Sequence, residues 1–149
     1  MAGIKVEERL FGEYVVGERY LSPGRTIDQA DITVFAGLTQ DFHPAHVDAA
    51  FAEAAYGARI AHGMLTFSIV TGLTVEYNLA AISYGYDRVR FPAPVTAGQT
   101  VVASAEVVEL RDAKDPRFGL VVKQYEGKVG DAVVFVCRHT LAVRREATR

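Results

Sequence analysis

The segment AHGMLTFSIVTGLTVEYN, residues 61 to 78, constrains the fold more than any other part of the chain. Its centre carries no charge, and its only polar side chains are the hydroxyls of Thr66, Ser68 and Thr71. Such hydroxyls can donate to carbonyls one turn back in the same helix. The length favours a helix over a buried strand, and a helix that is apolar on every side must be covered by protein. We expect Gly72 to let another backbone approach closely.

Strand-like segments fill the chain after residue 80. They read SYGYDRVRFPAPV, QTVVASAEVVEL, FGLVVKQYEG and AVVFVCRHTLAVR, and turn signals separate them at 97–98, 115–116 and 127–131. Consecutive antiparallel strands after one buried helix predict an α+β fold. A curved antiparallel sheet wrapped around the helix would bury most of the helix. The open sheet edge or a second copy of the chain would cover the rest.

Two short helices are expected before the apolar segment. TIDQADITVFAG has Thr26 and Gln29 at the spacing of a capping box, and Gly37 is placed to end the helix. AAFAEAAY follows Asp48, a good N-cap residue, and stops at Gly57. The 149 residues therefore predict a single domain with one core.

The composition excludes several classes of partner. The formal net charge is −2, so no general attraction to nucleic acid or to an anionic membrane is expected. No run of eighteen apolar residues spans a membrane, and the charged start of the chain does not resemble a signal peptide. The single cysteine, Cys137, lies in an apolar strand and is expected to be a buried, inert thiol. We expect a cytoplasmic protein.

The hexapeptide DFHPAH at residues 41 to 46 concentrates the reactive side chains. Asp41 and Pro44 could simply shape a turn, with His43 and His46 in solvent. His43, His46 and Asp41, with or without His62, could instead bind a metal, although their spacing matches no strong metal signature. In a third interpretation, a carboxylate and an imidazole on one stiff loop hold a single water as an acid/base pair.

Gly63, in AHGM, supplies what an acid/base pair would need. It stands at the start of the apolar helix, where the backbone N–H is free, carries the positive end of the helix dipole and is not shielded by a side chain. This N–H is a candidate oxyanion site for a polarised carbonyl. Such a site suits both the addition of water to an α,β-unsaturated thioester and the hydrolysis of a thioester, and the residues do not choose between them.

The segment DFHPAHVDAAFAEAAYGARIAHGMLTFSIVTGL resembles the MaoC-like dehydratases, the R-specific enoyl-CoA hydratases, with their Asp-x-Asn-Pro-x-His-x-Asp and His-Gly-Met motifs. RVRFPAPVTAGQTV resembles the Phe-x-x-Pro-Val-x-x-Gly strand and turn of the same family. The resemblance covers about residues 12 to 143. It implies a hot-dog fold, a curved sheet around one long helix, and a homodimer whose two sheets are continuous.

The resemblance also implies site residues. Asp41 and His46 match the catalytic acid and histidine, and Gly63 matches the glycine whose amide binds the thioester oxygen. Thr71 matches a small hydroxyl residue near the site, and His43 stands where the motif has asparagine.

Three further residues are candidates for substrate binding. His62 matches a common family residue and is expected to fix the loop through the backbone. Arg88 and Arg90, on one side of a strand, could contact the phosphates of coenzyme A or of a carrier protein, although a solvated face is the commoner role of such a pair.

Together these inferences predict a homodimeric hydro-lyase that hydrates a trans-2-enoyl thioester of coenzyme A or acyl-carrier protein, without a metal or redox cofactor. An acyl thioesterase and a non-catalytic acyl-binding module remain the alternatives.

Overall fold

The computed structural model describes residues 6 to 147 of the chain. Its main feature is a six-stranded sheet in the order β1-β4-β5-β6-β3, with β2 paired to β4. The strands are β1 (Arg19–Leu21), β2 (Arg25–Thr26), β3 (Ala81–Arg90), β4 (Thr100–Asp112), β5 (Phe118–Val129) and β6 (Ala132–Arg144). All pairs are antiparallel. The four strands predicted after residue 80 are confirmed as β3 to β6.

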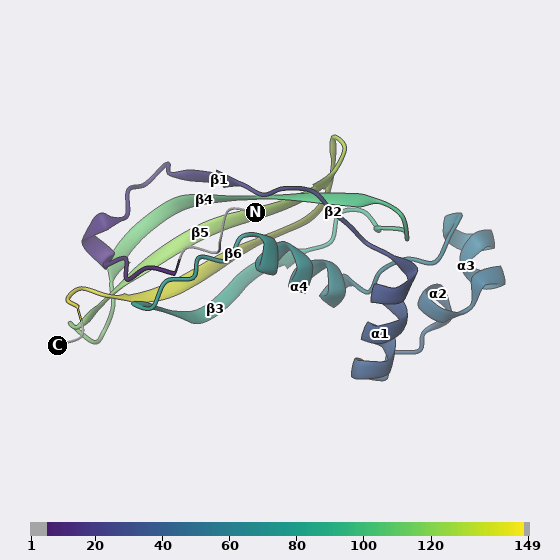
Figure 1. Ribbon diagram of the computed structural model, residues 1–149, viewed down its shortest axis with the longest axis horizontal. Coiled ribbons are helices and arrows are strands. Elements are labelled where there is room, and N and C mark those ends of the chain that lie inside the picture. Colours follow the sequence, from purple (N-terminus) through teal and green to yellow (C-terminus); the bar gives the residue numbers. More distant parts are fainter. Residues whose placement is uncertain (1–5, 148–149) are drawn as a thin grey trace.

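The helices are divided between the sheet and one of its ends. The long helix α4 (Gly63–Leu73) lies along one face of the curved sheet, and α1 (Gln29–Thr39), α2 (Pro44–Val47) and α3 (Ala49–Tyr56) lie together beyond one end of it (Figure 1). A short 3-10 helix, η1 (Phe11–Glu13), precedes β1. This arrangement confirms the predicted α+β hot-dog fold.

The core lies between α4 and the concave face of β4, β5 and β6. Leu65 and Val70 of α4 are buried in one cluster with Phe135 and Tyr125 from the sheet. A side chain at Gly127 of β5 would lie 2.6 Å from a methyl carbon of Val70, so this glycine lets the helix approach the strand. The sequence predicted such an approach at Gly72 instead, and that prediction is wrong for the described chain, where nothing lies within 4 Å of a side chain added at Gly72.

The helix limits differ from the predictions in two places. The apolar helix is shorter than residues 61 to 78: it ends at Leu73, where the hydroxyl of Thr74 donates to the carbonyl of Val70. The first helix begins at Gln29, so the predicted capping box of Thr26 and Gln29 is wrong.

At the start of α1, Asp28 takes the N-cap position, and its N–H donates to the carboxylate of Asp31 at 2.8 Å. The helix also continues past Gly37 and ends at Thr39, and its C-cap residue Gln40 has a left-handed backbone (φ 61°). The cap residues predicted for α3 are confirmed: Asp48 accepts from the N–H of Phe51, and Gly57 follows the last turn.

An ionic network that includes the buried Lys123 holds the segment that joins α4 to β3. The Lys123 ammonium lies 2.6 Å from the carboxylate of Glu76, which also accepts from the hydroxyl of Tyr14 at 2.6 Å. Burial alone would raise the pKa of Glu76. The hydrogen bonds from Lys123 and Tyr14 have the larger combined effect, so the pKa of Glu76 lies below its ordinary value. Burial lowers the pKa of Lys123 despite its pairing with Glu76.

The remaining fold predictions concern Cys137 and the membrane. Cys137 is fully buried, as predicted, and burial raises the pKa of its thiol to about 12, which makes the thiol unreactive. Within residues 6 to 147, none of the helices combines the length and the apolar character needed to cross a bilayer.

Candidate active site

Asp41 lies in the loop between α1 and α2. Its carboxylate accepts the N–H of His43 at 3.3 Å, which is the turn that the sequence suggested for this residue. The bond is long and the side chain is exposed, so the carboxylate retains capacity to accept further hydrogen bonds.

His46 is held in one orientation and one tautomer. Its Nδ1 lies 2.7 Å from the carbonyl oxygen of Ile60. A carbonyl only accepts, so Nδ1 carries the proton of the neutral ring and Nε2 keeps a free lone pair. The His46 ring can therefore accept a proton at Nε2 without losing the bond that positions it.

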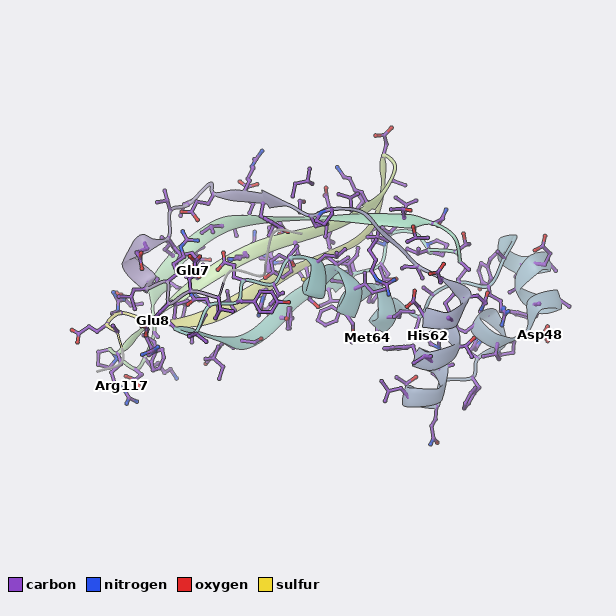
Figure 2. The ribbon with its side chains drawn as sticks, in the orientation of Figure 1. Glu7, Glu8, Asp48, His62, Met64 and Arg117 are labelled. Atoms are coloured by element: carbon purple, nitrogen blue, oxygen red, sulfur yellow. The ribbon has the colours of Figure 1, made fainter. Side chains whose placement is uncertain are left out.

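His62 is the N-cap residue of α4 and contacts both Asp41 and His46. It is buried, and its Nε2 donates to the backbone carbonyl of Asp41 at 3.0 Å. Its ring stacks on the ring of His46, with 3.7 Å between centroids and 23° between planes. Figure 2 shows His62 at the end of α4 that faces α1. The predicted loop-fixing role of His62 agrees with these contacts.

The structure brings Asp41, His46 and His62 into one cluster. One donor or acceptor atom from each lies within 4.8 Å of those of the other two. A separation of this size between Asp41 and His46 allows one water molecule to hydrogen-bond both groups at about 2.8 Å each. Residues 21 positions apart in the sequence, Asp41 and His62, therefore lie in one cluster with His46.

Gly63 is the first residue of α4, directly after His62. Its N–H has no hydrogen-bond partner among the described residues, because the first bonds of the helix come from Leu65 and Thr66 to His62. A side chain at Gly63 would meet the ring of Phe91 at 3.2 Å. The glycine thus leaves a free donor at the positive end of an eleven-residue helix, beside an aromatic ring.

His43 has a structural role in the loop. Its Nδ1 accepts the N–H of Ala45 at 3.2 Å, and Pro44 occupies the first position of α2. Asparagine, the residue of the family motif, also caps helices in this way. The edge of the His43 ring faces His46 with 6.0 Å between centroids, so the ring lies near the site but outside the cluster.

Thr71, Arg88 and Arg90 are not part of the cluster. The Thr71 hydroxyl donates within α4, to the carbonyls of Phe67 and Ser68. Arg88 has a left-handed backbone (φ 54°), and the pairing of β3 with β6 shifts register between Asp87 and Arg90. This bulge breaks the period of two on which the shared face of the two arginines was predicted.

Asp41, His46 and His62 are the three residues of the cluster that could bind a metal ion. One nitrogen of each ring donates to a backbone carbonyl, so His46 Nε2 and His62 Nδ1 would be the nitrogen ligands, beside the Asp41 carboxylate. His62 Nδ1 is buried without a partner among the described residues. His43, part of the four-residue set considered from the sequence, accepts from the backbone instead.

Two contributors were not identified from the sequence. Phe91 covers Gly63, and the carbonyl of Ile60 orients His46. Phe91 belongs to the recognised strand-and-turn motif, but no spacing indicates that its ring reaches α4. No residue pattern indicates which backbone carbonyl will accept a hydrogen bond from His46.

Comparison with known proteins assigns the family. Residues 13–129 match the family model described as a MaoC like domain. The chain is 40% identical over 93 residues to 3-hydroxyacyl-thioester dehydratase Z of Mycobacterium tuberculosis (58% of this chain, 62% of that protein). It is 37% identical over 91 residues to the (R)-specific enoyl-CoA hydratase of Rhodospirillum rubrum (60% of this chain, 63% of that protein).

The matched region spans less than two thirds of the length of both relatives. Among solved structures, a protein of Archaeoglobus described as a monoamine oxidase regulatory protein has a TM-score of 0.87 and 34% identity, over 95% of this chain and 97% of that one. The family model alone covers most of the chain, including Asp41, His46 and Gly63. The chain belongs to the family of MaoC-like domains.

Proposed function

We propose that the chain reversibly hydrates a trans-2-enoyl thioester to the R-3-hydroxyacyl thioester. The observation that carries the proposal is the cluster itself. One ligand atom each of Asp41, His46 and His62 lies within 4.8 Å of the other two, a separation that one bridging water fits. His46 has a free Nε2, and His62 is followed by Gly63 with its free N–H.

Each group has a distinct task in the proposed reaction. The Gly63 N–H binds the thioester oxygen, which gains negative charge when water adds to the β-carbon. Asp41 and His46 hold the water between them, one proton leaves it, and one proton reaches the α-carbon. The two groups act as a coupled pair, so neither proton is assigned to one residue.

The names of the relatives support this class of reaction. One is a 3-hydroxyacyl-thioester dehydratase and another is an (R)-specific enoyl-CoA hydratase. Dehydration and hydration are the two directions of the same reversible reaction type. The carrier of the acyl group, coenzyme A or acyl-carrier protein, stays open. Exposed Arg88 and Arg90 remain the predicted phosphate ligands, and a cytoplasmic location and independence of metals remain predictions.

The exposed apolar surface supports a homodimer. Met64 of α4 is 54% exposed, and Ile82 and Tyr84 of the edge strand β3 are 65% and 72% exposed. An edge strand with unpaired backbone groups and apolar side chains is a ready surface for a second copy. Pairing of two β3 edges would continue the sheet and cover the open face of α4. Sedimentation equilibrium tests this: a mass of one chain at micromolar concentration contradicts the dimer.

Incubation with crotonyl-CoA tests the reaction. Loss of the enone absorbance without release of free thiol is the expected result. Release of free thiol would identify the alternative, a thioesterase. No change with crotonyl-CoA and with longer enoyl-CoA thioesters would contradict catalysis and favour a non-catalytic acyl-binding module.

A further inference from the structure

The face of the sheet that points away from α4 contains a cavity that the proposed reaction does not use. Cys137 of β6 is buried in the core with Leu65 of α4. Side chains alternate between the two faces of a strand, so Arg138 and Thr140 of β6 point to the opposite face. The cavity there has a volume of about 350 Å³ and is lined by residues of β3, β4, β5 and β6.

Thr140 lines this cavity with a hydroxyl group that has no hydrogen-bond partner among residues 6 to 147. Thr140 is only 4% exposed, and its neighbour on β5, Val122, has an apolar side chain. Its neighbour on β3 is Gly85, where an added side chain would meet nothing within 4 Å. Gly85 therefore leaves the cavity open beside Thr140. A buried hydroxyl of this kind favours a ligand with an acceptor oxygen, because an unmade hydrogen bond is costly.

Three guanidinium groups, those of Arg88, Arg111 and Arg138, line the same cavity. The Nε of Arg138 donates to the side-chain oxygen of Gln124 over a long distance of 3.4 Å, and Arg111 lies 3.8 Å from Glu109. Within the described part of the chain, neither Arg88 nor Arg138 forms an ion pair. A guanidinium has five N–H donors, so most of these donors are not used by the protein.

The bulge in β3 brings Arg88 to this cavity. Arg88 has a left-handed backbone (φ 54°), and the register with β6 shifts between Asp87 and Arg90. A bulge can re-aim a side chain, and a non-glycine residue keeps a positive φ only where the surrounding structure holds it there. Arg88 lines the cavity, whereas Arg90 does not. The bulge therefore separates the two arginines and adds one of them to the arginines of β4 and β6.

The charge of the cavity favours an anion. Its lining also includes the carboxylates of Asp87 and Glu109, so three positive groups face two negative ones. Guanidinium groups bind oxyanions through paired, charge-assisted hydrogen bonds. A phosphate group has three strong acceptor oxygens and can accept from Arg111, Arg138 and Thr140 together, whereas a carboxylate has only two oxygens.

We propose that this cavity binds the phosphate group of a small molecule, with Arg111, Arg138 and Thr140 as donors and Arg88 as a further one. Two sources share this chemistry: coenzyme A, for whose phosphates Arg88 was predicted, and a phosphorylated compound separate from the substrate. The proposed pairing of two β3 edges uses backbone groups in the plane of the sheet, whereas these side chains stand perpendicular to it. The cavity therefore stays open in the proposed homodimer.

Titration of the nitrogen-15-labelled protein with sodium phosphate, followed by NMR at constant ionic strength, tests the site. The amide signals of Arg138 and Thr140 are expected to shift saturably, with a dissociation constant of roughly 1 mM or lower. Sodium butyrate is the comparison anion. It is expected to bind roughly tenfold more weakly, because it has fewer acceptor oxygens and less charge.

Arg138→Gln is expected to weaken phosphate binding roughly tenfold, the effect of losing one charge-assisted hydrogen bond. Thr140→Val keeps the β-branched shape, removes the hydroxyl and is expected to weaken binding roughly fivefold. Arg19→Gln is the matched control, because Arg19 is an exposed arginine on β1 that lies 3.1 Å from Glu106 and outside the cavity. It is expected to keep the wild-type dissociation constant.

Coenzyme A distinguishes the two sources of phosphate. Coenzyme A that binds in the cavity shifts the same amide signals and competes with inorganic phosphate. A separate phosphorylated ligand is indicated when inorganic phosphate binds with an unchanged constant in the presence of saturating coenzyme A.

Three results overturn the proposal. They are the absence of a saturable shift at Arg138 and Thr140 up to about 10 mM phosphate, equal binding of butyrate, and phosphate binding that both Arg138→Gln and Thr140→Val leave unchanged. None of these measurements requires catalysis, so they are independent of the outcome of the crotonyl-CoA assay.

Discussion

The rings of His46 and His62 stack with 3.7 Å between their centroids, and His62 also donates to the backbone carbonyl of Asp41. One buried side chain therefore fixes both members of the proposed catalytic pair, through a ring face on one side and a hydrogen bond on the other. Because His62 precedes Gly63, the same residue ties the pair to the free N–H of α4. The positions of the three proposed catalytic groups are thus coupled.

Asp41→Asn and His46→Gln are each expected to lower kcat for crotonyl-CoA hydration by roughly a hundredfold, as for a positioned acid/base group. Circular dichroism should show an unchanged fold, since Asp41 is exposed and His46 only partly buried. The double variant should be scarcely slower than the slower single variant, because both groups act on one water. Near-full activity in either folded single variant contradicts the assignment.

Gly63→Ala is expected to lower kcat/KM by roughly tenfold. The added methyl group would lie 3.2 Å from the Phe91 ring and would either shift that ring or narrow access to the free N–H. Adding Phe91→Leu to Gly63→Ala should recover part of the loss, because it removes the ring that the methyl group meets. If Gly63→Ala hydrates crotonyl-CoA like the wild type, the N–H is not the carbonyl site.

His43→Asn is expected to keep both the α2 cap and hydratase activity, because asparagine also accepts the N–H of residue 45. His43→Ala should instead lower the free energy of unfolding by about 1 kcal/mol in urea titrations. Loss of hydratase activity in folded His43→Asn would show that the site needs the histidine itself and not only the cap that it makes.

Activity is expected to persist after prolonged chelation, because the spacing of Asp41, His43 and His46 matches no strong metal signature and the proposed reaction needs only Asp41, His46 and the Gly63 N–H. Elemental analysis of the purified protein should find no stoichiometric zinc or iron. One tightly held equivalent per chain, with activity lost on its removal, would make Asp41, His46 and His62 a metal site instead.

His139 is expected to make stability depend on pH. Burial, and then the charge of Lys123, lower the pKa of His139 from 6.5 to about 4. Between these values the unfolded chain binds a proton that the folded chain does not, so stability falls as the pH falls from about 6.5 to about 4. The loss amounts to roughly 3 kcal/mol in total.

Urea titrations of the wild type and of His139→Gln across this range check the prediction. The variant lacks the titrating group, so its free energy of unfolding should fall less on acidification than that of the wild type. A difference between the two proteins that is constant with pH would show that His139 is not the responsible group.

Much of the local structure could be predicted from the sequence, and its motifs indicated the class of reaction. The all-apolar stretch predicted α4, the alternation after residue 80 predicted β3 to β6, and Asp48 and Gly57 marked both ends of α3. Asp41, His46 and Gly63 were predicted as site residues because an acid/base pair beside a free helix N–H suits thioester chemistry and because they match the motifs of the family. These features depend on neighbours in the chain, which a sequence displays directly.

Which distant groups meet could not be predicted from the sequence, because it depends on packing between separate elements. The close approach of a backbone to α4 occurs at Gly127 on β5 rather than at Gly72, because the curvature of the sheet sets where a strand passes under the helix. The stack of His62 on His46, the Phe91 ring over Gly63 and the bond from Ser83 to His139 follow from packing between separate elements. The bulge at Arg88 likewise results from pairing with β6, since a register is a property of two strands and not of one.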